Sequence, residues 1–188
     1  MIIKTRDQDI INAIEDFRIM TSGQIYKLFF ADSSERYGRM RLQLLTSMGF
    51  IKRARSTINN NNAYYIDKRS CQIHHDLIRS ELYVNLKSKY EIMEWTNEAT
   101  ILNIRPDAIA YIKDHGIIFP VFVEVHLNNI FSFDKYAELY KNNDLKAMYG
   151  IIPRVIICGD RKLVLPNSIG IKFKVVGLDM KGLESIFK

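Results

Sequence analysis

The sequence lacks both a cysteine framework and a long apolar run. Its two cysteines, Cys71 and Cys158, lie far apart in a chain of 188 residues, which favours a reduced intracellular protein over a disulfide-stabilised secreted domain. No apolar run approaches the ~20 residues that span a bilayer. The first residues show neither the apolar stretch nor the small-residue cleavage site of a signal peptide. We therefore expect a cytoplasmic protein without a membrane segment.

Acidic side chains are missing from one stretch of the chain. Hydrophobic residues make up 47% and charged residues 26%, but the net charge of +6 is unevenly placed. Residues 1–70 hold 12 Lys and Arg against 7 Asp and Glu, and the stretch from Arg36 to Arg55 holds basic side chains and no acidic one. Concentrated positive charge is typical of a phosphate-binding surface. A solvated basic face is the alternative.

Three helices are predicted in the first third of the chain. Apolar residues recur at helical spacing over residues 7–17, after an acidic first turn. Thr21 and Gln24 form a capping-box pair that predicts the start of a short second helix. A polar cap then predicts a third helix over residues 35–48, which Gly49 ends.

A basic hairpin is predicted directly after the third helix. Residues 50–56 alternate between apolar and other side chains, residues 59–62 are all asparagine, and residues 63–66 form a second strand. On the third helix, most polar residues fall opposite a wide apolar arc. Arg41 falls within that arc, where its stem must lie along apolar neighbours to bring the guanidinium to solvent.

Three helices followed by a basic hairpin, with the stretch LLTSMGFIKR at their junction, resemble winged-helix regulators. The resemblance implies that the third helix enters the major groove of double-stranded DNA, while the hairpin contacts phosphates or the minor groove. Base contacts are then expected from Arg36, Arg39 and Gln43. The DNA-binding residues predicted in this way are Arg36, Arg39, Arg41, Gln43, Lys52, Arg53 and Arg55. A winged helix used for protein contacts is the alternative.

The rest of the chain, residues 69–188, is predicted to be a mixed α/β domain. Helical spacing predicts helices over residues 74–89 and 133–149. Short apolar runs predict strands over residues 92–95, 101–104, 108–112, 118–125, 155–158 and 173–176.

Two carboxylates in this domain are predicted to face each other. Asp107 and Glu124 are equidistant from the point between positions 115 and 116, which lies inside the hairpin turn predicted at residues 113–116. Symmetric pairing would bring their Cβ atoms to ~5 Å, with His126 on the same face. Facing carboxylates repel, share a proton or hold a hard cation such as Mg²⁺. Pro120 argues against this register because it removes a hydrogen-bond donor from the ladder.

The RPD and VEVH segments resemble the PD-(D/E)xK nuclease-like fold. The resemblance implies that Glu81, Asp107 and Glu124 surround one or two metal ions, with Asp107 and Glu124 as ligands of Mg²⁺ or Mn²⁺. His126 stands where that family has the lysine that stabilises charge on the scissile phosphate. Lys135, on the following helix, is the alternative source of this positive charge.

A winged helix followed by RPDA, FVEVH and KYAELY is similar, over most of the chain, to the replication-relaxation family of plasmids, phages and integrative elements. That resemblance implies a role in plasmid replication or DNA relaxation. The predicted fold class is therefore α+β. A winged helix-turn-helix spans residues 1–68, and a small α/β nuclease-like domain of PD-(D/E)xK type spans residues 69–188.

Three functions fit these features. In the first, the chain is a DNA-binding regulator of transcription or replication on a mobile element, needs no cofactor, and uses its second domain for dimerisation or a protein partner. In the second, that domain is a metal-dependent nuclease or nickase. In the third, the chain is a protein-interaction adaptor. The missing lysine at position 126 favours the first, and the few basic contacts predict a homodimer through residues 69–188.

Overall fold

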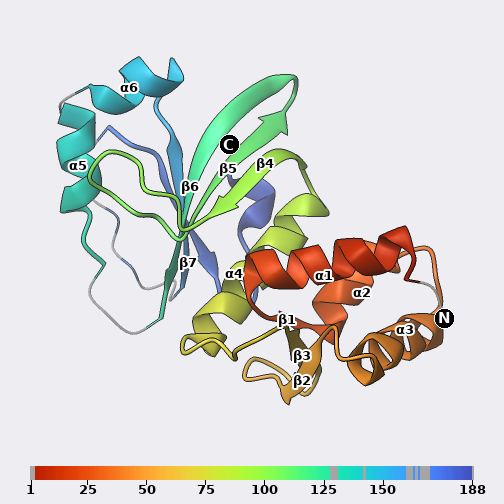
Figure 1. The fold of residues 1–188 in the computed structure, drawn as a ribbon. Helices are drawn as coiled ribbons and strands as arrows, with labels where there is room; N and C mark the ends of the chain where they lie inside the picture. Colours follow the sequence, from red (N-terminus) through yellow and green to blue (C-terminus); the bar gives the residue numbers. More distant parts are fainter. Residues whose placement is uncertain are drawn as a thin grey trace. The chain divides into compact units, whose positions relative to one another are not determined.

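The chain divides into two units, Met1–Val84 and Asn85–Lys188, and each contains helices and one β-sheet (Figure 1). The computed structural model describes residues 3–127, 131–141, 143–159, 163, 165 and 170–187. The α+β class predicted from the sequence is confirmed. Among the described helices, none combines the length and the apolar character that crossing a membrane requires.

The first unit contains three helices and a small antiparallel sheet with the strand order β1–β3–β2. Its elements are α1 (Thr5–Phe17), β1 (Met20–Thr21), α2 (Ser22–Phe29), α3 (Glu35–Ser47), β2 (Lys52–Arg55) and β3 (Asn62–Tyr65).

The predicted capping box at the start of α2 is confirmed. The backbone N–H of Gln24 donates to the Thr21 hydroxyl over 3.2 Å, and the backbone N–H of Thr21 donates to Gln24 Oε1 over 2.7 Å. The amide of the same glutamine also donates to the Leu77 carbonyl over 2.9 Å. The buried Gln24 side chain therefore caps α2 and also binds the helix that carries Leu77.

Helices α2 and α3 approach each other closely at Gly38. A Cβ atom added there would lie 2.9 Å from the Tyr26 ring and 3.2 Å from the Phe30 ring. Such distances are too short for a larger residue without displacement of the rings. The absence of a side chain at position 38 thus sets the separation of these two helices.

An ion pair joins α3 to α1. The Arg41 guanidinium donates to both oxygens of buried Asp7, with Nε 3.0 Å from Oδ1. Burial would raise the pKa of Asp7, but hydrogen bonds from Arg41 and from the Lys4 backbone outweigh it, and the pKa lies below its usual value. Arg41 therefore meets an internal partner at the position where the sequence predicted an extended stem.

Most of α4 (Ile73–Lys87) groups with the first unit. Leu77 packs against Ile19 and Ala63, and the Ser80 hydroxyl donates to the Ile19 carbonyl over 3.2 Å. The sequence placed the domain boundary after residue 68, whereas the two units divide after Val84. These long-range contacts, which no local pattern reveals, account for the difference.

The second unit is built on a five-stranded sheet with the order β4–β5–β6–β7–β8. Strands β4, β5 and β6 pair antiparallel, while β6, β7 and β8 pair parallel. Its elements are β4 (Glu91–Asn97), β5 (Ala108–Asp114), β6 (Ile117–His126), α5 (Asp134–Lys141), α6 (Asp144–Tyr149), β7 (Arg154–Gly159), β8 (Phe173–Gly177) and a 3₁₀ turn (Leu183–Ser185).

The predicted register of the central hairpin is confirmed. Ala108 pairs with Val123 and Asp114 pairs with Ile117, so Pro120 shifts nothing. His115 and Gly116 form the turn with φ values of 46° and 83°. A two-residue turn with both φ values positive matches the twist of the strands and fixes their alignment.

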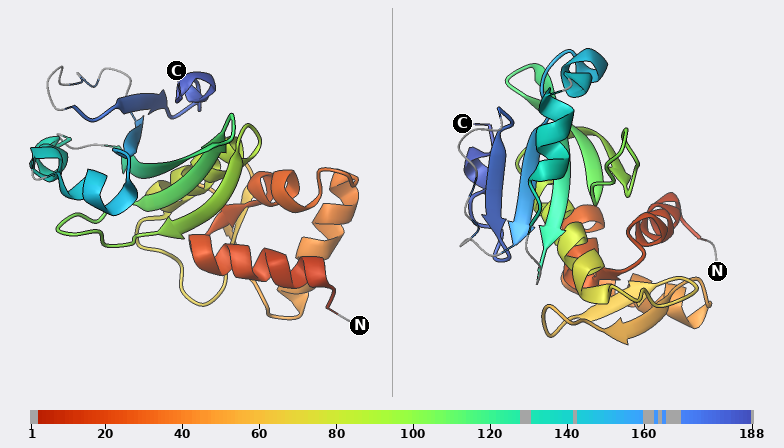
Figure 2. Two further views of the ribbon diagram at one scale, coloured as in Figure 1. Left: turned by 90° about the horizontal axis from the view of Figure 1, so that it is seen from above. Right: turned by 90° about the vertical axis from the view of Figure 1, so that its left-hand side faces the viewer.

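Helices α5 and α6 cover one face of this sheet, beside β6 and β7 (Figure 2). Tyr136 and Leu145 pack there against Phe122 and Ile157. The single helix predicted over residues 133–149 is divided, and Asn143 adopts a left-handed conformation at the start of α6. The strand predicted over residues 101–104 is only an isolated bridge, because Leu102 turns the backbone with a positive φ.

Replacing Asp7 by Asn is expected to lower the free energy of unfolding by about 2 kcal/mol near neutral pH, because Arg41 loses its carboxylate partner. The folded-state pKa of Asp7 lies below the unfolded value. The stabilisation is therefore present above the unfolded pKa and is lost as pH falls through the folded pKa. Urea unfolding of both proteins at neutral pH and at about pH 3 measures this difference. A difference that does not shrink in acid would contradict the prediction.

Candidate functional site

The outward face of α3 combines basic, polar and apolar side chains. Arg36, Arg39, Met40 and Gln43 are all exposed. The guanidiniums of Arg36 and Arg39 make no hydrogen bond or ion pair within the part of the chain that the structure describes. Because these guanidiniums are free and solvated, they are available to an external anion.

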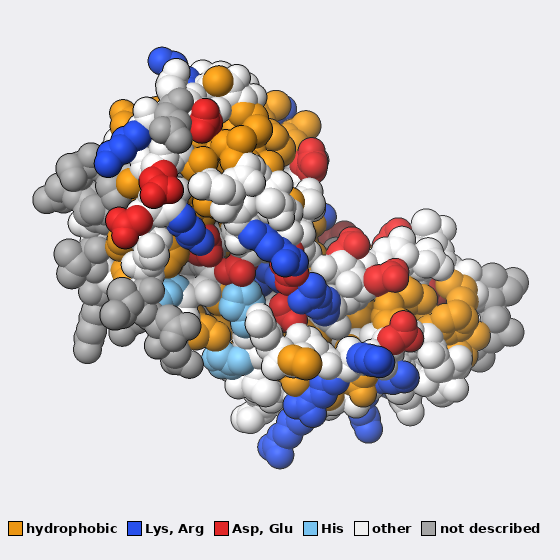
Figure 3. All heavy atoms as spheres, turned by 60° about the vertical axis from the view of Figure 1, so that its left-hand side comes forward, with side chains coloured by type: hydrophobic (Ala, Val, Ile, Leu, Met, Phe, Trp, Pro, Cys, Tyr) orange, Lys and Arg blue, Asp and Glu red, His pale blue; other side chains and the backbone are white. Residues whose placement is uncertain are grey.

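The β2 strand carries the other predicted cations. Lys52, Arg53 and Arg55 are exposed, and Lys52 donates to the Asp67 carbonyl over 2.8 Å. Figure 3 shows Lys and Arg side chains that project into solvent at the lower edge of the face that it draws. The hairpin thus presents positive charge to solvent.

The cations of α3 and of the hairpin act on one phenol. Burial raises the pKa of Tyr64, and the nearby phenol of Tyr26 adds to this increase. The charges of Arg53 and Arg39 oppose it. Both guanidiniums therefore lie within electrostatic reach of Tyr64 on β3, and α3 and β2 contribute to one positively charged region.

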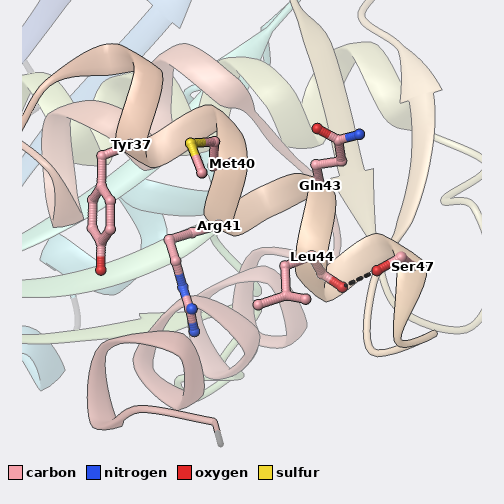
Figure 4. A pocket seen from close by; sticks show the side chains of 6 residues that line it. All are labelled: Tyr37, Met40, Arg41, Gln43, Leu44 and Ser47. Carbon is pink, nitrogen blue, oxygen red and sulfur yellow. Dashed lines mark hydrogen bonds between the residues drawn. The ribbon is translucent and has the colours of Figure 1, made fainter. Parts of the chain in front are cut away.

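A hollow of about 470 Å³ opens on the same helix (Figure 4). Arg41 extends from it toward α1, where Asp7 lies. The lining is otherwise uncharged, and Ser47 at one end donates its hydroxyl to the Leu44 carbonyl over 2.8 Å. The residues around the hollow are Tyr37, Met40, Arg41, Gln43, Leu44 and Ser47.

The second unit brings the predicted carboxylates to one face of its sheet. The β5–β6 register places Asp107 opposite Glu124, on the face that also carries Phe122. Asp107 Oδ2 accepts from the Val125 backbone N–H over 2.6 Å. Helix α5 covers this face, because Tyr136 packs against Phe122.

Glu124 is buried beneath α5 with two donors on one oxygen. Lys135 Nζ and the Tyr136 hydroxyl each lie 2.5 Å from Glu124 Oε1. Burial raises the pKa of Glu124, the hydrogen bonds from Lys135 and Tyr136 lower it, and the charge of Asp107 raises it, with a net increase. A buried carboxylate with a raised pKa and a specific charge partner is typical of functional sites.

Lys135 therefore lies beside Glu124, where the alternative source of positive charge was expected. Its ammonium is also 5.1 Å from the centre of the Tyr136 ring and 5.7 Å from that of Phe131. His126 contacts the Phe131 ring edge to face, with the centroids 5.7 Å apart. Thus Asp107, Glu124 and Lys135 are brought together, with His126 at the end of β6.

The predicted first-helix carboxylate belongs to the other unit. Glu81 accepts from the Gln24 amide over 3.0 Å and from Lys27 Nζ over 3.1 Å, and all three residues lie in the first unit. Glu81 therefore contributes to the attachment of α4 to α2.

Two residues of these sites were missed from the sequence. Tyr136 is part of the core, and its buried hydroxyl donates to Glu124; its position next to Lys135 is the signal that the sequence offers. Met40 has an apolar side chain, yet it lies on the outward face of α3 and is 58% exposed. An exposed methionine among arginines becomes visible only once the rotation of the helix is known.

Asp107 and Glu124 offer oxygen ligands suited to a hard cation. Magnesium is commonly held by one or two carboxylates, with water and substrate phosphate completing its shell. No group of three or more His, Cys, Asp or Glu suited to a metal occurs among the residues that the structure describes. A cation held by Asp107 and Glu124 would therefore take the rest of its shell from water or from substrate.

No protein-family model matches the chain, and no curated protein sequence is significantly similar to it. The assignment of its sites therefore depends on their geometry and chemistry.

Replacing Glu124 by Gln is expected to raise the free energy of unfolding at neutral pH by about 1 kcal/mol, because the variant buries no charge. The pKa of Glu124 is higher in the folded state than in the unfolded state. Wild-type stability from this group is therefore lost as pH rises from the unfolded toward the folded pKa. Unfolding curves across this range should show that the free energy of unfolding of the variant increases relative to that of the wild type as pH rises.

Glu94→Gln is the matched control, because Glu94 is exposed on β4. This variant should follow the wild type at every pH. A Glu124→Gln protein less stable than the wild type at all pH values would show that the carboxylate stabilises the fold.

Proposed function

We propose that the first unit is a winged helix-turn-helix that binds double-stranded DNA. The order of α1, β1, α2, α3 and the β2–β3 hairpin, with β1 completing the sheet, supports this assignment. In the proposed complex, α3 enters the major groove and the hairpin lies along the phosphate backbone.

The observation that carries this proposal is the set of exposed cations on α3 and β2. Arg36, Arg39, Arg53 and Arg55 are exposed, and their guanidiniums hold no hydrogen bond or ion pair to other described residues. Phosphate binding by such side chains releases counterions and supplies most of the affinity of DNA-binding proteins. A regulatory role on a mobile element is part of this proposal, and a homodimer through residues 69–188 stays a prediction.

Removing these cations is expected to weaken DNA binding in a salt-dependent way. The Arg36→Ala/Arg39→Ala protein should bind a 30-base-pair duplex of mixed sequence at least about tenfold more weakly. The Arg53→Ala/Arg55→Ala protein should flatten the plot of log affinity against log salt by about two units, because each guanidinium that neutralises a phosphate adds about one unit to the slope. Fluorescence anisotropy over a range of NaCl concentrations measures both effects.

Lys146→Ala/Lys172→Ala is the matched control, because it removes the same charge from exposed positions in the second unit. It should bind DNA like the wild type. Absence of binding to any duplex, or an affinity that is insensitive to salt, would refute the DNA-binding proposal and favour a protein partner.

A second candidate function is metal-dependent cleavage of DNA by the second unit. The hydrogen bond between Lys135 and Glu124 favours it, because it supplies the ammonium that position 126 lacks. Asp107 and Glu124 would hold Mg²⁺ or Mn²⁺, which supplies an activated water when bound. Lys135 would stabilise the charge on the scissile phosphate, and Tyr136 would orient Glu124 through its hydroxyl.

Supercoiled plasmid with Mg²⁺ or Mn²⁺ tests this candidate. An active enzyme should nick the plasmid, and Asp107→Ala, Glu124→Ala and Lys135→Ala should each reduce the rate at least about 100-fold. Lys146→Ala, on the exposed side of α6, should leave the rate unchanged. Gel electrophoresis of the plasmid forms over time measures the rates. If the plasmid stays intact with the wild type in the presence of either metal, the cleavage proposal is rejected. The DNA-binding proposal would be unaffected by that result.

A further inference from the structure

We infer that α3 reads an A·T base pair, with the thymine 5-methyl group seated in the hollow beside Met40. This inference rests on the proposed DNA binding and names the base pair that the same surface recognises. It concerns the uncharged centre of the basic face, which phosphate binding does not explain.

Met40 lies in the middle of the outward stripe of α3. Arg36, Met40, Gln43 and Ser47 follow one another at intervals of four, three and four residues, so they share one side of the helix. Met40 is 58% exposed in this polar company. At the centre of a basic face this apolar side chain offers a contact to an apolar group on the partner.

The apolar group that the major groove offers is the thymine methyl. Each A·T pair presents that methyl beside the adenine N6 and N7 atoms, which glutamine recognises with two hydrogen bonds. Met40 and Gln43 are separated by ~4.5 Å along the helix axis, close to the ~3.4 Å spacing of base pairs. The two side chains therefore reach the same pair or neighbouring pairs.

The hollow continues the apolar surface beside Met40. Leu44 and Tyr37 border it, and the guanidinium of Arg41 is turned away to Asp7. The uncharged side chains leave room for a methyl group without placing a cation against it. Arg36 within the stripe and Arg39 beside it carry free positive charge, which favours a duplex over an apolar protein segment as the occupant.

Thymine analogues test the inference directly. Duplexes selected from a random library by the wild-type protein should share at least one A·T pair. Resynthesis with deoxyuridine at each thymine in turn removes one methyl group at a time. At one or two positions, deoxyuridine should weaken binding about fourfold, the change expected for one buried methyl group.

The protein variants assign this effect to α3. In Met40→Ala the penalty for deoxyuridine should vanish, and in Gln43→Ala discrimination between A·T and G·C at that position should fall at least about fivefold. Met93→Ala is the matched control, because Met93 is 53% exposed on β4 of the second unit. It should behave like the wild type.

Two outcomes would overturn the inference without touching DNA binding itself. One is selection of no shared sequence by a protein that still binds duplexes in a salt-dependent way. The other is a selected site at which deoxyuridine has no effect, or has the same effect in Met40→Ala. Failure of the wild type to bind any duplex would instead remove the proposed function on which the inference rests.

Discussion

The ion pair between Asp7 and Arg41 determines which side of α3 meets solvent. A guanidinium facing the interior without a carboxylate is strongly unfavourable, so the helix settles with Arg41 toward α1. That rotation turns Met40 and Gln43 outward. Asp7 is held in turn by the Lys4 backbone at the start of α1. The chemistry of the proposed DNA-reading surface thus depends on a carboxylate that never touches it.

Two buried carboxylates in this chain have opposite properties. The surroundings of Asp7 lower its pKa, whereas those of Glu124 leave its pKa raised despite the hydrogen bonds from Lys135 and Tyr136. The first carboxylate stabilises the fold at neutral pH, and the second opposes it. Burying a charge at such a cost is a common property of active sites. The two carboxylates are therefore expected to have opposite effects on stability at neutral pH.

The parts of this fold that depend on neighbouring residues could be predicted from the sequence. The capping box at Thr21 and the two-residue turn at His115–Gly116 are decided within a few residues, so the sequence was sufficient for both. The turn also fixed the register that sets Asp107 opposite Glu124. The partner of Arg41 and the attachment of α4 to the first unit depend on residues far apart in the chain. No periodicity or spacing encodes them.

The position of Lys135 changes the weight of the missing motif lysine. The PD-(D/E)xK pattern has a lysine two residues after the position of Glu124, where this chain has His126. The chemistry requires only that an ammonium lie beside the carboxylate and the scissile phosphate, whichever element carries it. Helix α5 crosses the same sheet face and delivers Nζ to Glu124 Oε1. The lack of a lysine at position 126 is therefore no argument that the second unit is catalytically inactive. Both proposed activities rest on the geometry of named residues in this chain.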